Sequence, residues 1–124
     1  MLLTDTHALI WFAADDHRLS RAARAALVDP QQKVFVSVVC YWEIEVKRLR
    51  SSEFSPPEPV RALMDRAGFH PLGMDFDVPV RLAGLPRVHG DPFDRMLVAQ
   101  ALHHGLTLVT GDRALRRYPV PTLW

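Results

Sequence analysis

Four acidic residues that could hold a divalent metal ion stand in separate segments of the sequence: Asp5, Glu43, Asp94 and Asp112. Carboxylates that converge on one place repel and raise one another's pKa unless a cation or protons compensate them. A fifth acid, Asp91, precedes Asp94 by three residues, a spacing that puts two side chains on one face of a helix. Because hard oxygen ligands select Mg²⁺ or Mn²⁺ over zinc, convergence of these acids would create a magnesium or manganese site. Such an ion can polarise a phosphate oxygen and activate water.

Whether the acids converge depends on the elements that carry them. Short apolar runs alternate along the chain with segments of helical periodicity. The expected strands are residues 2–5, 33–38, 70–72 and 106–109, with an additional edge strand at 121–124. Helices are expected at residues 7–13, 40–50, 59–67 and 78–85, with a last turn at 112–116. Another helix is expected to begin at Leu19 and Ser20 and to stop at Asp29 and Pro30. A further helix is opened by residues 89–92 and ends at His104, before Gly105.

This alternation predicts an α/β fold with a parallel sheet of four to five strands and right-handed crossovers. At 124 residues the chain fits a single domain, residues 1–124, with one buried core. Ligands of open parallel sheets sit beyond the carboxyl ends of the strands. Asp5 ends the first expected strand, Glu43 lies one turn into the helix after the second, and Asp112 follows the 106–109 strand. The acids are therefore expected near one rim of the sheet.

Each acid also has a structural interpretation. Asp91 precedes Pro92 and suits an N-cap, which would make Asp94 the third helical residue, where the helix dipole favours a carboxylate. Asp5 and Asp112 could cap the helical segments that follow them. Glu43 could face solvent beside the stripe that residues 42, 46 and 49 form at i, i+4 and i+7. The constellation, rather than any single acid, favours a functional site.

Composition excludes several classes of protein and leaves others open. Hydrophobic residues make up 48% of the chain and charged residues 23%, the balance of an ordinary globular domain. The formal charge of +1 does not identify a partner, because a near-neutral total can hide segregated patches. Cys40 is the only cysteine, which excludes an internal disulfide, and it is expected to be buried. No apolar stretch reaches a membrane span and the first residues do not resemble a signal peptide, so a cytoplasmic protein is expected.

Basic and hydroxyl side chains near the acids are candidates for supporting roles. Arg18, Lys47, Arg95 and Arg113 lie in basic clusters or beside the acids, where they could grip the phosphates of a nucleic acid. Solvated helix faces are the alternative for these clusters, and Arg95 could instead pair with a neighbouring acid.

Thr6 and Thr110 could orient a carboxylate or a water through their hydroxyls, although Thr110 also suits an ordinary strand end. His89 could contact substrate or anchor its loop. The tryptophans Trp11, Trp42 and Trp124 are expected in the core or at a dimer interface.

Four stretches of the chain carry a family resemblance: residues 3–10 (LTDTHALI), 37–47 (SVVCYWEIEVK), 89–101 (HGDPFDRMLVAQA) and 106–112 (LTLVTGD). Together they resemble the PIN-domain nucleases, and within them the VapC-like toxins of bacterial toxin–antitoxin pairs. By motif, Asp5, Glu43, Asp94 and Asp112 match the acids of the family's active site. The sequence departs from the commonest family pattern in having DTHA in place of DTN at the first motif, so no ligand role is assigned to His7. Asp91 belongs to a DPFDR variant and is either an auxiliary acid or a cap.

The resemblance implies a three-layer α/β/α fold and a ribonuclease that depends on Mg²⁺ or Mn²⁺. The hypothesis is in-line attack of a metal-activated water on an RNA phosphodiester, leaving a 3′-hydroxyl and a 5′-phosphate. The resemblance further implies a homodimer and inhibition by a small VapB-like antitoxin. In this scheme Asp5 and Asp94 bind the metal directly, while Glu43 and Asp112 ligate it, hold water or complete a second metal site.

Three other functions are compatible with parts of the pattern. A phosphatase with an aspartyl nucleophile would need a paired acid two residues after Asp5 and a well-placed lysine after a later strand, and both are missing. A catalytically silent PIN-like module that binds RNA or protein would be expected to lack some of the acids, all of which are retained. A PIN nuclease of RNA processing, without a toxin role, would share the same residues.

Overall fold

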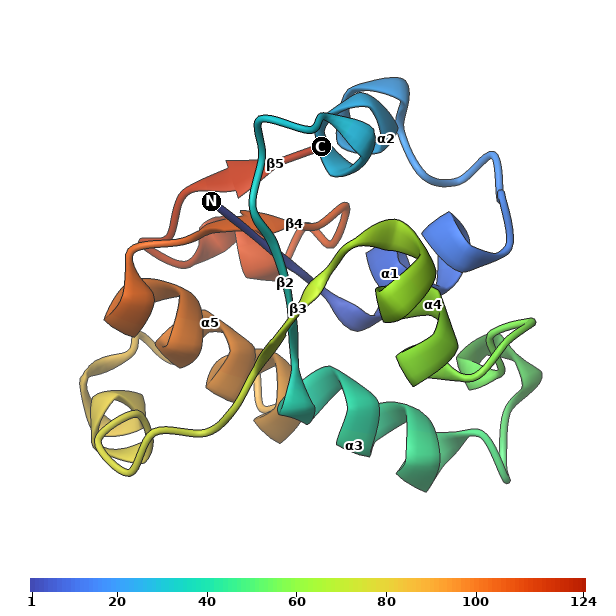
Figure 1. The fold of residues 1–124 in the computed structure, drawn as a ribbon. Coiled ribbons are helices and arrows are strands. Elements are labelled where there is room, and N and C mark those ends of the chain that lie inside the picture. The colour runs from blue at the N-terminus through green and yellow to red at the C-terminus, as the bar shows by residue number, and fades with distance from the viewer.

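A computed structural model describes all residues, 1–124, and shows a parallel sheet with helices on both sides (Figure 1). The strands are β1 (Leu2–Thr4), β2 (Val34–Ser37), β3 (His70–Leu72), β4 (Thr107–Val109) and β5 (Thr122–Leu123). The α-helices are α1 (Thr6–Ala13), α2 (Arg21–Val28), α3 (Val38–Lys47), α4 (Val60–Ala67) and α5 (Pro92–His104). Three short 3₁₀ segments complete the chain: η1 (Ser52–Phe54), η2 (Pro79–Gly84) and η3 (Leu115–Arg117).

The sheet contains five parallel strands in the order β3-β2-β1-β4-β5. Its central strand, β1, pairs Leu3 with Phe35 of β2 on one side and with Leu108 of β4 on the other. The predicted α/β class, the parallel pairing and the number of strands are confirmed. Chain order reverses on the two sides of β1, so the strand ends beside it open a crevice, where open α/β sheets usually bind ligands.

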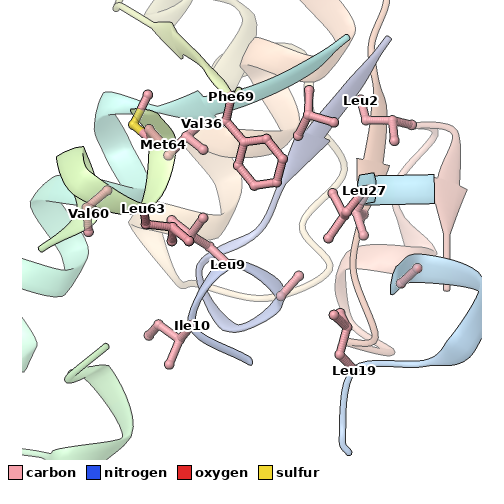
Figure 2. Close-up of a cluster of buried hydrophobic side chains, with 14 of the residues drawn as sticks. Leu2, Leu9, Ile10, Leu19, Leu27, Val36, Val60, Leu63, Met64 and Phe69 are labelled. Carbon is pink, nitrogen blue, oxygen red and sulfur yellow. The ribbon is translucent and has the colours of Figure 1, made fainter. Parts of the chain in front are cut away.

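Two hydrophobic clusters cover the two faces of the sheet. One joins β1 and β2 to α1, α2 and α4, and includes Leu9, Leu27 and Leu63 (Figure 2). The other lies under α5 and η2 and includes Leu97 and Leu108. Figure 1 shows α5 on one side of β2 and β3 and α1 and α4 on the other, which gives the three layers expected from the family resemblance.

Side chains and glycines fix the helix ends where the sequence indicates. The Ser20 hydroxyl accepts a hydrogen bond from the Ala23 N–H at 3.0 Å and caps α2, as predicted. Gly105 ends α5 with φ +63°, in the left-handed region that glycine enters at no steric cost. The predicted burial of Cys40 is also confirmed, and its thiol donates to the Thr4 carbonyl oxygen at 3.4 Å.

Several sequence-based boundaries are wrong. The segment expected as a helix at 78–85 forms 3₁₀ turns (η2), and the last turn, expected at 112–116, forms η3, which begins three residues later and ends one residue later. Helix α3 begins at Val38 rather than residue 40, because the Ser37 hydroxyl accepts from the Val39 N–H at 2.9 Å and ends the strand there. The stripe of Trp42, Val46 and Leu49 is exposed, so Trp42 does not lie in the core and an interface is the expectation that remains for it. None of the helices is long and apolar enough to cross a membrane.

Candidate active site

Asp5 sits at the first turn after the central strand. Strand β1 ends at Thr4, and Asp5 is the N-cap of α1, its Oδ1 accepting from the Ala8 N–H at 2.6 Å. The side chain is almost completely buried, with 5% of the residue exposed. The predicted strand thus ends one residue earlier than expected, and the capping interpretation of Asp5 is correct. Capping uses Oδ1 of the carboxylate, and Asp5 also lines the pocket described below.

Glu43 reaches the same place from α3. It is also 5% exposed, so the solvent-facing alternative for this residue is wrong. Its Oε2 accepts from the Thr6 hydroxyl at 2.5 Å and its Oε1 accepts from the Lys47 ammonium at 2.6 Å. Thr6 therefore orients a carboxylate, the role expected of it. The salt bridge between residues 43 and 47 spans one turn of α3 and fixes the buried acid.

Asp91 and Asp94 open α5. Asp91 is the N-cap, accepting from the Asp94 N–H at 3.0 Å, and Pro92 occupies the first helical position. The other carboxylate oxygen of Asp91 lies 3.9 Å from the Lys47 ammonium, so this cap also borders the acidic cluster. Asp94 is partly buried, and its Oδ2 lies 3.0 Å from Nε2 of His89.

Asp112 follows β4 and is exposed. Its Oδ1 accepts from the Ala114 N–H at 2.7 Å, and its own N–H donates to the Thr110 hydroxyl at 3.1 Å. The preceding residue, Gly111, packs closely against Trp124, because a Cβ added to Gly111 would lie 2.6 Å from the Trp124 ring. Only glycine therefore lets the chain pass between the C-terminal tryptophan and the acidic cluster without displacing one of them.

All five predicted acids line one pocket of about 360 Å³. Lys47 is the only lysine or arginine among its lining residues, which are Asp5, Thr6, His7, Trp11, Glu43, Lys47, Phe54, Asp91, Asp94, Gly111, Asp112 and Leu115. The convergence has a topological cause. β1 and β4 are adjacent parallel strands whose carboxyl ends meet at one edge, and α3 and α5 enter the sheet at that same edge.

Burial and nearby negative charges raise the pKa values of two of the acids, Asp5 and Asp94. Burial, reinforced by the charges of Asp94 and Asp112, raises the pKa of Asp5 to about 7, although hydrogen bonds from Thr110 and Ala8 act in the opposite direction. Burial also raises the pKa of Asp94, and the charges of Asp91 and Glu43 add to the effect. The pocket thus holds more negative charge than its single lysine compensates.

The basic residues predicted to contact phosphates differ in where they lie relative to the pocket. Lys47 lies inside the pocket, and its ammonium is tied to Glu43. Arg18 pairs with Asp16 and stacks its guanidinium 4.9 Å from the centre of the Trp11 ring, at the pocket's border. Arg113 is exposed beside Asp112.

Arg95 faces away from the acids. It donates to the carbonyl oxygens of Pro86 and Leu82 and to the Tyr118 hydroxyl, at 2.9, 3.3 and 3.1 Å respectively. The alternative in which Arg95 pairs with a neighbouring acid is wrong, because the two loop carbonyls and the Tyr118 hydroxyl accept its hydrogen bonds.

The sequence did not point to two residues of the site, Tyr118 and Phe54. Tyr118 contacts His89, a residue expected to touch substrate or anchor its loop, and His89 in turn contacts Asp94. Phe54 lies between the helices expected at 40–50 and 59–67 and is buried against the pocket, with the Lys47 ammonium 4.8 Å from its ring centre. An isolated phenylalanine in a polar loop was the one available signal for η1, whereas nothing local connects residue 118 with residue 89.

Comparison with known proteins agrees with this geometry. Residues 2–121 match the PIN domain family. The chain belongs to the PIN domain family. A PIN domain relative from Mycobacterium tuberculosis, Ribonuclease VapC22, is 32% identical over 132 aligned positions, which cover 99% of this chain and 98% of the relative.

Solved structures share the same fold at low sequence identity. VapBC2 from Rickettsia felis, crystallised with a DNA fragment from its promoter, has a TM-score of 0.71 at 13% identity, over 98% of this chain and 96% of that chain. A toxin–antitoxin complex from Klebsiella pneumoniae has a TM-score of 0.67 at 21% identity, over 100% of this chain and 97% of that chain. The resemblance noted in the sequence is confirmed at the level of family and fold.

Proposed function

We propose that this chain, as a single domain of residues 1–124, is a divalent-metal-dependent endoribonuclease and the toxin of a toxin–antitoxin pair. One observation carries the enzymatic part: five carboxylates from four segments line one pocket at the carboxyl edge of the sheet. No serine or cysteine is among the lining residues, so hydrolysis by an activated water suits the site better than a covalent intermediate on a side-chain nucleophile. The full-length relative named as a ribonuclease supports RNA as the substrate.

The residues of the pocket fit a divalent metal ion. Their donor atoms are carboxylate oxygens, the ligands of Mg²⁺ and Mn²⁺. Burial first, and the charges of neighbouring acids second, raise the pKa values of Asp5 and Asp94, and a cation bound beside them would favour their ionised forms. Asp5 and Asp94 are proposed as direct ligands, Glu43 and Asp112 as further ligands or water-binding groups, and Asp91 as an auxiliary acid that also caps α5. A divalent ion held there supplies Lewis-acid activation of the phosphate and of the attacking water.

The surrounding side chains hold the acids in place. The Thr6 hydroxyl and the Lys47 ammonium each occupy one oxygen of Glu43, which fixes the carboxylate plane. The Thr110 hydroxyl accepts from the Asp112 N–H, which holds the backbone of that acid at the end of β4. His89 orients Asp94. These contacts pre-organise the site before an RNA phosphate arrives.

Substrate RNA would approach past the basic groups at the pocket's border. Arg18 and Arg113 are exposed there and free of contact with the five acids, so they are the proposed contacts to flanking phosphates. Cleavage is proposed to leave a 3′-hydroxyl and a 5′-phosphate. Because its substrate is cellular RNA, the protein is proposed to act in the cytoplasm.

A cognate VapB-like antitoxin and a second copy of the chain are the proposed protein partners. The antitoxin is supported by the toxin–antitoxin complexes among the structural neighbours. The homodimer is supported by the exposed apolar face of α3, formed by Val38, Tyr41, Trp42 and Val46 and continued by Leu49. An apolar hollow of about 600 Å³ lies beside this face, between α3 and α5. Exposed apolar surface of this extent indicates an interface.

The decisive experiment compares RNA cleavage by matched acidic variants. Purified protein is incubated with total RNA in Mg²⁺, in Mn²⁺ and in EDTA. Asp5→Asn, Asp94→Asn and Glu43→Gln are expected to lose at least about 100-fold in rate, the usual scale for removing an electrostatic catalytic group. Glu45→Gln and Asp65→Asn are the controls, since both acids are exposed and pair only with an arginine on their own helix.

Two outcomes would contradict the proposal. Equal cleavage by wild type and Asp5→Asn would assign the activity to a contaminant, and absence of cleavage of any RNA would favour a binding module. The toxin role is tested separately by expression in cells: growth arrest that Asp5→Asn abolishes is expected. Cleavage without growth arrest would indicate a nuclease of RNA processing.

A further inference from the structure

A second cluster of metal-ligating side chains lies at the opposite end of α5 from Asp94. His103 and His104 are the last two residues of the helix, and Asp75 belongs to the segment between β3 and η2. Nε2 of His104 lies 3.0 Å from Oδ2 of Asp75, and Nε2 of His103 lies 3.8 Å from the same oxygen. One ligand atom from each residue lies within 4.8 Å of the other two. Asp94 precedes His104 by ten residues of α5, so about 15 Å along the helix axis separates this cluster from the acidic pocket.

One atom of the cluster has no partner. Nε2 of His104 is shielded from solvent and makes no hydrogen bond, because its close contact with Asp75 is poorly aligned. Enclosed polar atoms in folded proteins are nearly always satisfied, so an unsatisfied ring nitrogen facing a carboxylate needs an explanation. A cation between the two groups would satisfy both.

We propose that Asp75, His103 and His104 form a zinc-type metal site, distinct from the acidic pocket, that ties the Asp75 segment to the end of α5. Two imidazole nitrogens and one carboxylate are the donors that Zn²⁺ and similar transition metals prefer, whereas Mg²⁺ prefers an all-oxygen shell. The chain therefore offers two chemically different sites at the two ends of one helix. The proposal does not depend on nuclease activity.

Arg81 contacts one of the proposed ligands, and its removal gives a second, independent test of the site. Its Nε donates to Nδ1 of His103 at 3.0 Å, which leaves the proton of a neutral imidazole on Nε2 and opposes metal binding there. A metal ion would have to displace this contact. Arg81 and His103 border an open hollow of about 680 Å³, so the guanidinium has space to move away and water can reach the site.

The alternative is an ion pair without a metal. Protonated histidines at the C-terminus of a helix are favoured by its dipole, and Asp75 could compensate their charge. This arrangement would respond to pH but not specifically to zinc, which makes the two interpretations separable.

The experiment measures Zn²⁺ binding to the full chain carrying Asp5→Asn and Asp94→Asn, in excess Mg²⁺, so that the acidic pocket does not contribute. Isothermal titration is expected to show one Zn²⁺ per chain, together with a rise in Tm. His104→Gln, His103→Gln and Asp75→Asn are each expected to weaken binding by about 10-fold or more. Arg81→Ala is expected to tighten it several-fold.

His17→Gln and His70→Gln are the controls, because both histidines are exposed and lie outside the cluster. Thermal unfolding of each variant in EDTA separates loss of a ligand from loss of the fold. Zinc binding that persists in His103→Gln and His104→Gln would overturn the proposal, as would a chain with the acidic pocket disabled that binds no Zn²⁺ at micromolar concentrations. Nuclease activity enters neither readout, so the proposed function and this site can fail separately.

Discussion

His89 lies between an acid of the pocket and a buried tyrosine: its Nε2 is 3.0 Å from Oδ2 of Asp94, and its Nδ1 is 2.7 Å from the Tyr118 hydroxyl. Each ring nitrogen thus has one partner, which fixes the plane of the imidazole. Because the carboxylate of Asp94 is held through the ring, its orientation depends on a residue near the end of the chain. His89 and Tyr118 are positioning residues in the proposed mechanism.

Tyr118→Phe is expected to slow RNA cleavage by about 3- to 10-fold, the effect of about 1 kcal/mol from one lost hydrogen bond. The substitution removes the hydroxyl that contacts His89 and Arg95 but keeps the buried ring. Measured kinetics should show the loss in kcat, with KM little changed. Tyr41→Phe is the matched control, since Tyr41 is exposed on α3. Full activity in Tyr118→Phe would mean that the Tyr118 hydroxyl is not needed to orient His89 and Asp94.

The metal-free protein is expected to lose stability as pH rises through the range in which Asp5 ionises. Its pKa is raised from 3.8 to about 7 in the folded chain, so the folded state binds this proton more tightly than the unfolded state. The stabilisation is complete below pH 3.8 and is lost as pH increases to about 7. At pH 7.5 in EDTA, Asp5→Asn should therefore raise Tm by about 5 °C, the effect of roughly 1–2 kcal/mol.

Asparagine keeps the N-cap of α1, so the comparison isolates the charge. The difference in Tm between variant and wild type should shrink at pH 4, and also on addition of Mn²⁺, which compensates the carboxylate. Thermal unfolding followed by circular dichroism measures both dependences. A variant less stable than the wild type in EDTA at pH 7.5 would show that the ionised carboxylate of Asp5 does not destabilise the folded chain.

Lys47→Met is expected to tighten Mn²⁺ binding about 5-fold. Lys47 is the cation already present in the pocket, 2.6 Å from Oε1 of Glu43 and 3.9 Å from Oδ2 of Asp91, so it competes electrostatically with a metal ion. Methionine keeps a flexible apolar side chain beside Phe54 and Phe93 but removes the ammonium, which lies 4.8 and 5.1 Å from the centres of their rings. Titration calorimetry with Mn²⁺ gives the affinity. Lys33→Met is the control, because Lys33 is the only other lysine in the chain. Weaker Mn²⁺ binding by Lys47→Met would show that the hold of Lys47 on Glu43 outweighs the repulsion between its charge and the metal ion.

Val46→Lys is expected to convert the proposed homodimer into a monomer of 14.1 kDa. Val46 is 47% exposed in the middle of the apolar face of α3, where a buried ammonium would oppose a second copy. Light scattering coupled to size-exclusion chromatography measures the mass. Val28→Lys changes a valine on α2 that is 61% exposed and should leave the dimer intact. A wild type that is monomeric at all concentrations would reject the homodimer itself.

The sequence by itself determined the architecture and the membership of the acidic cluster. The elements follow from local rules: the hydroxyl cap at Ser20, the glycine stop at Gly105 and the apolar runs of the strands each act over a few residues. Because parallel strands connected by helices must align their carboxyl ends, residues 5 and 112 could be assigned to one edge without coordinates. The family match supports the same assignment.

Tertiary structure alone decided which partner each supporting side chain contacts and which face of α3 is exposed. The contacts between Thr6 and Glu43 and between His89 and Tyr118 join residues 37 and 29 positions apart, and no periodicity links them. The apolar stripe on α3 has helical spacing in either orientation, so only packing could show that Glu43 points inward and Val46 outward. Local patterns fix which elements form, whereas the partners of a polar side chain depend on what distant segments place beside it.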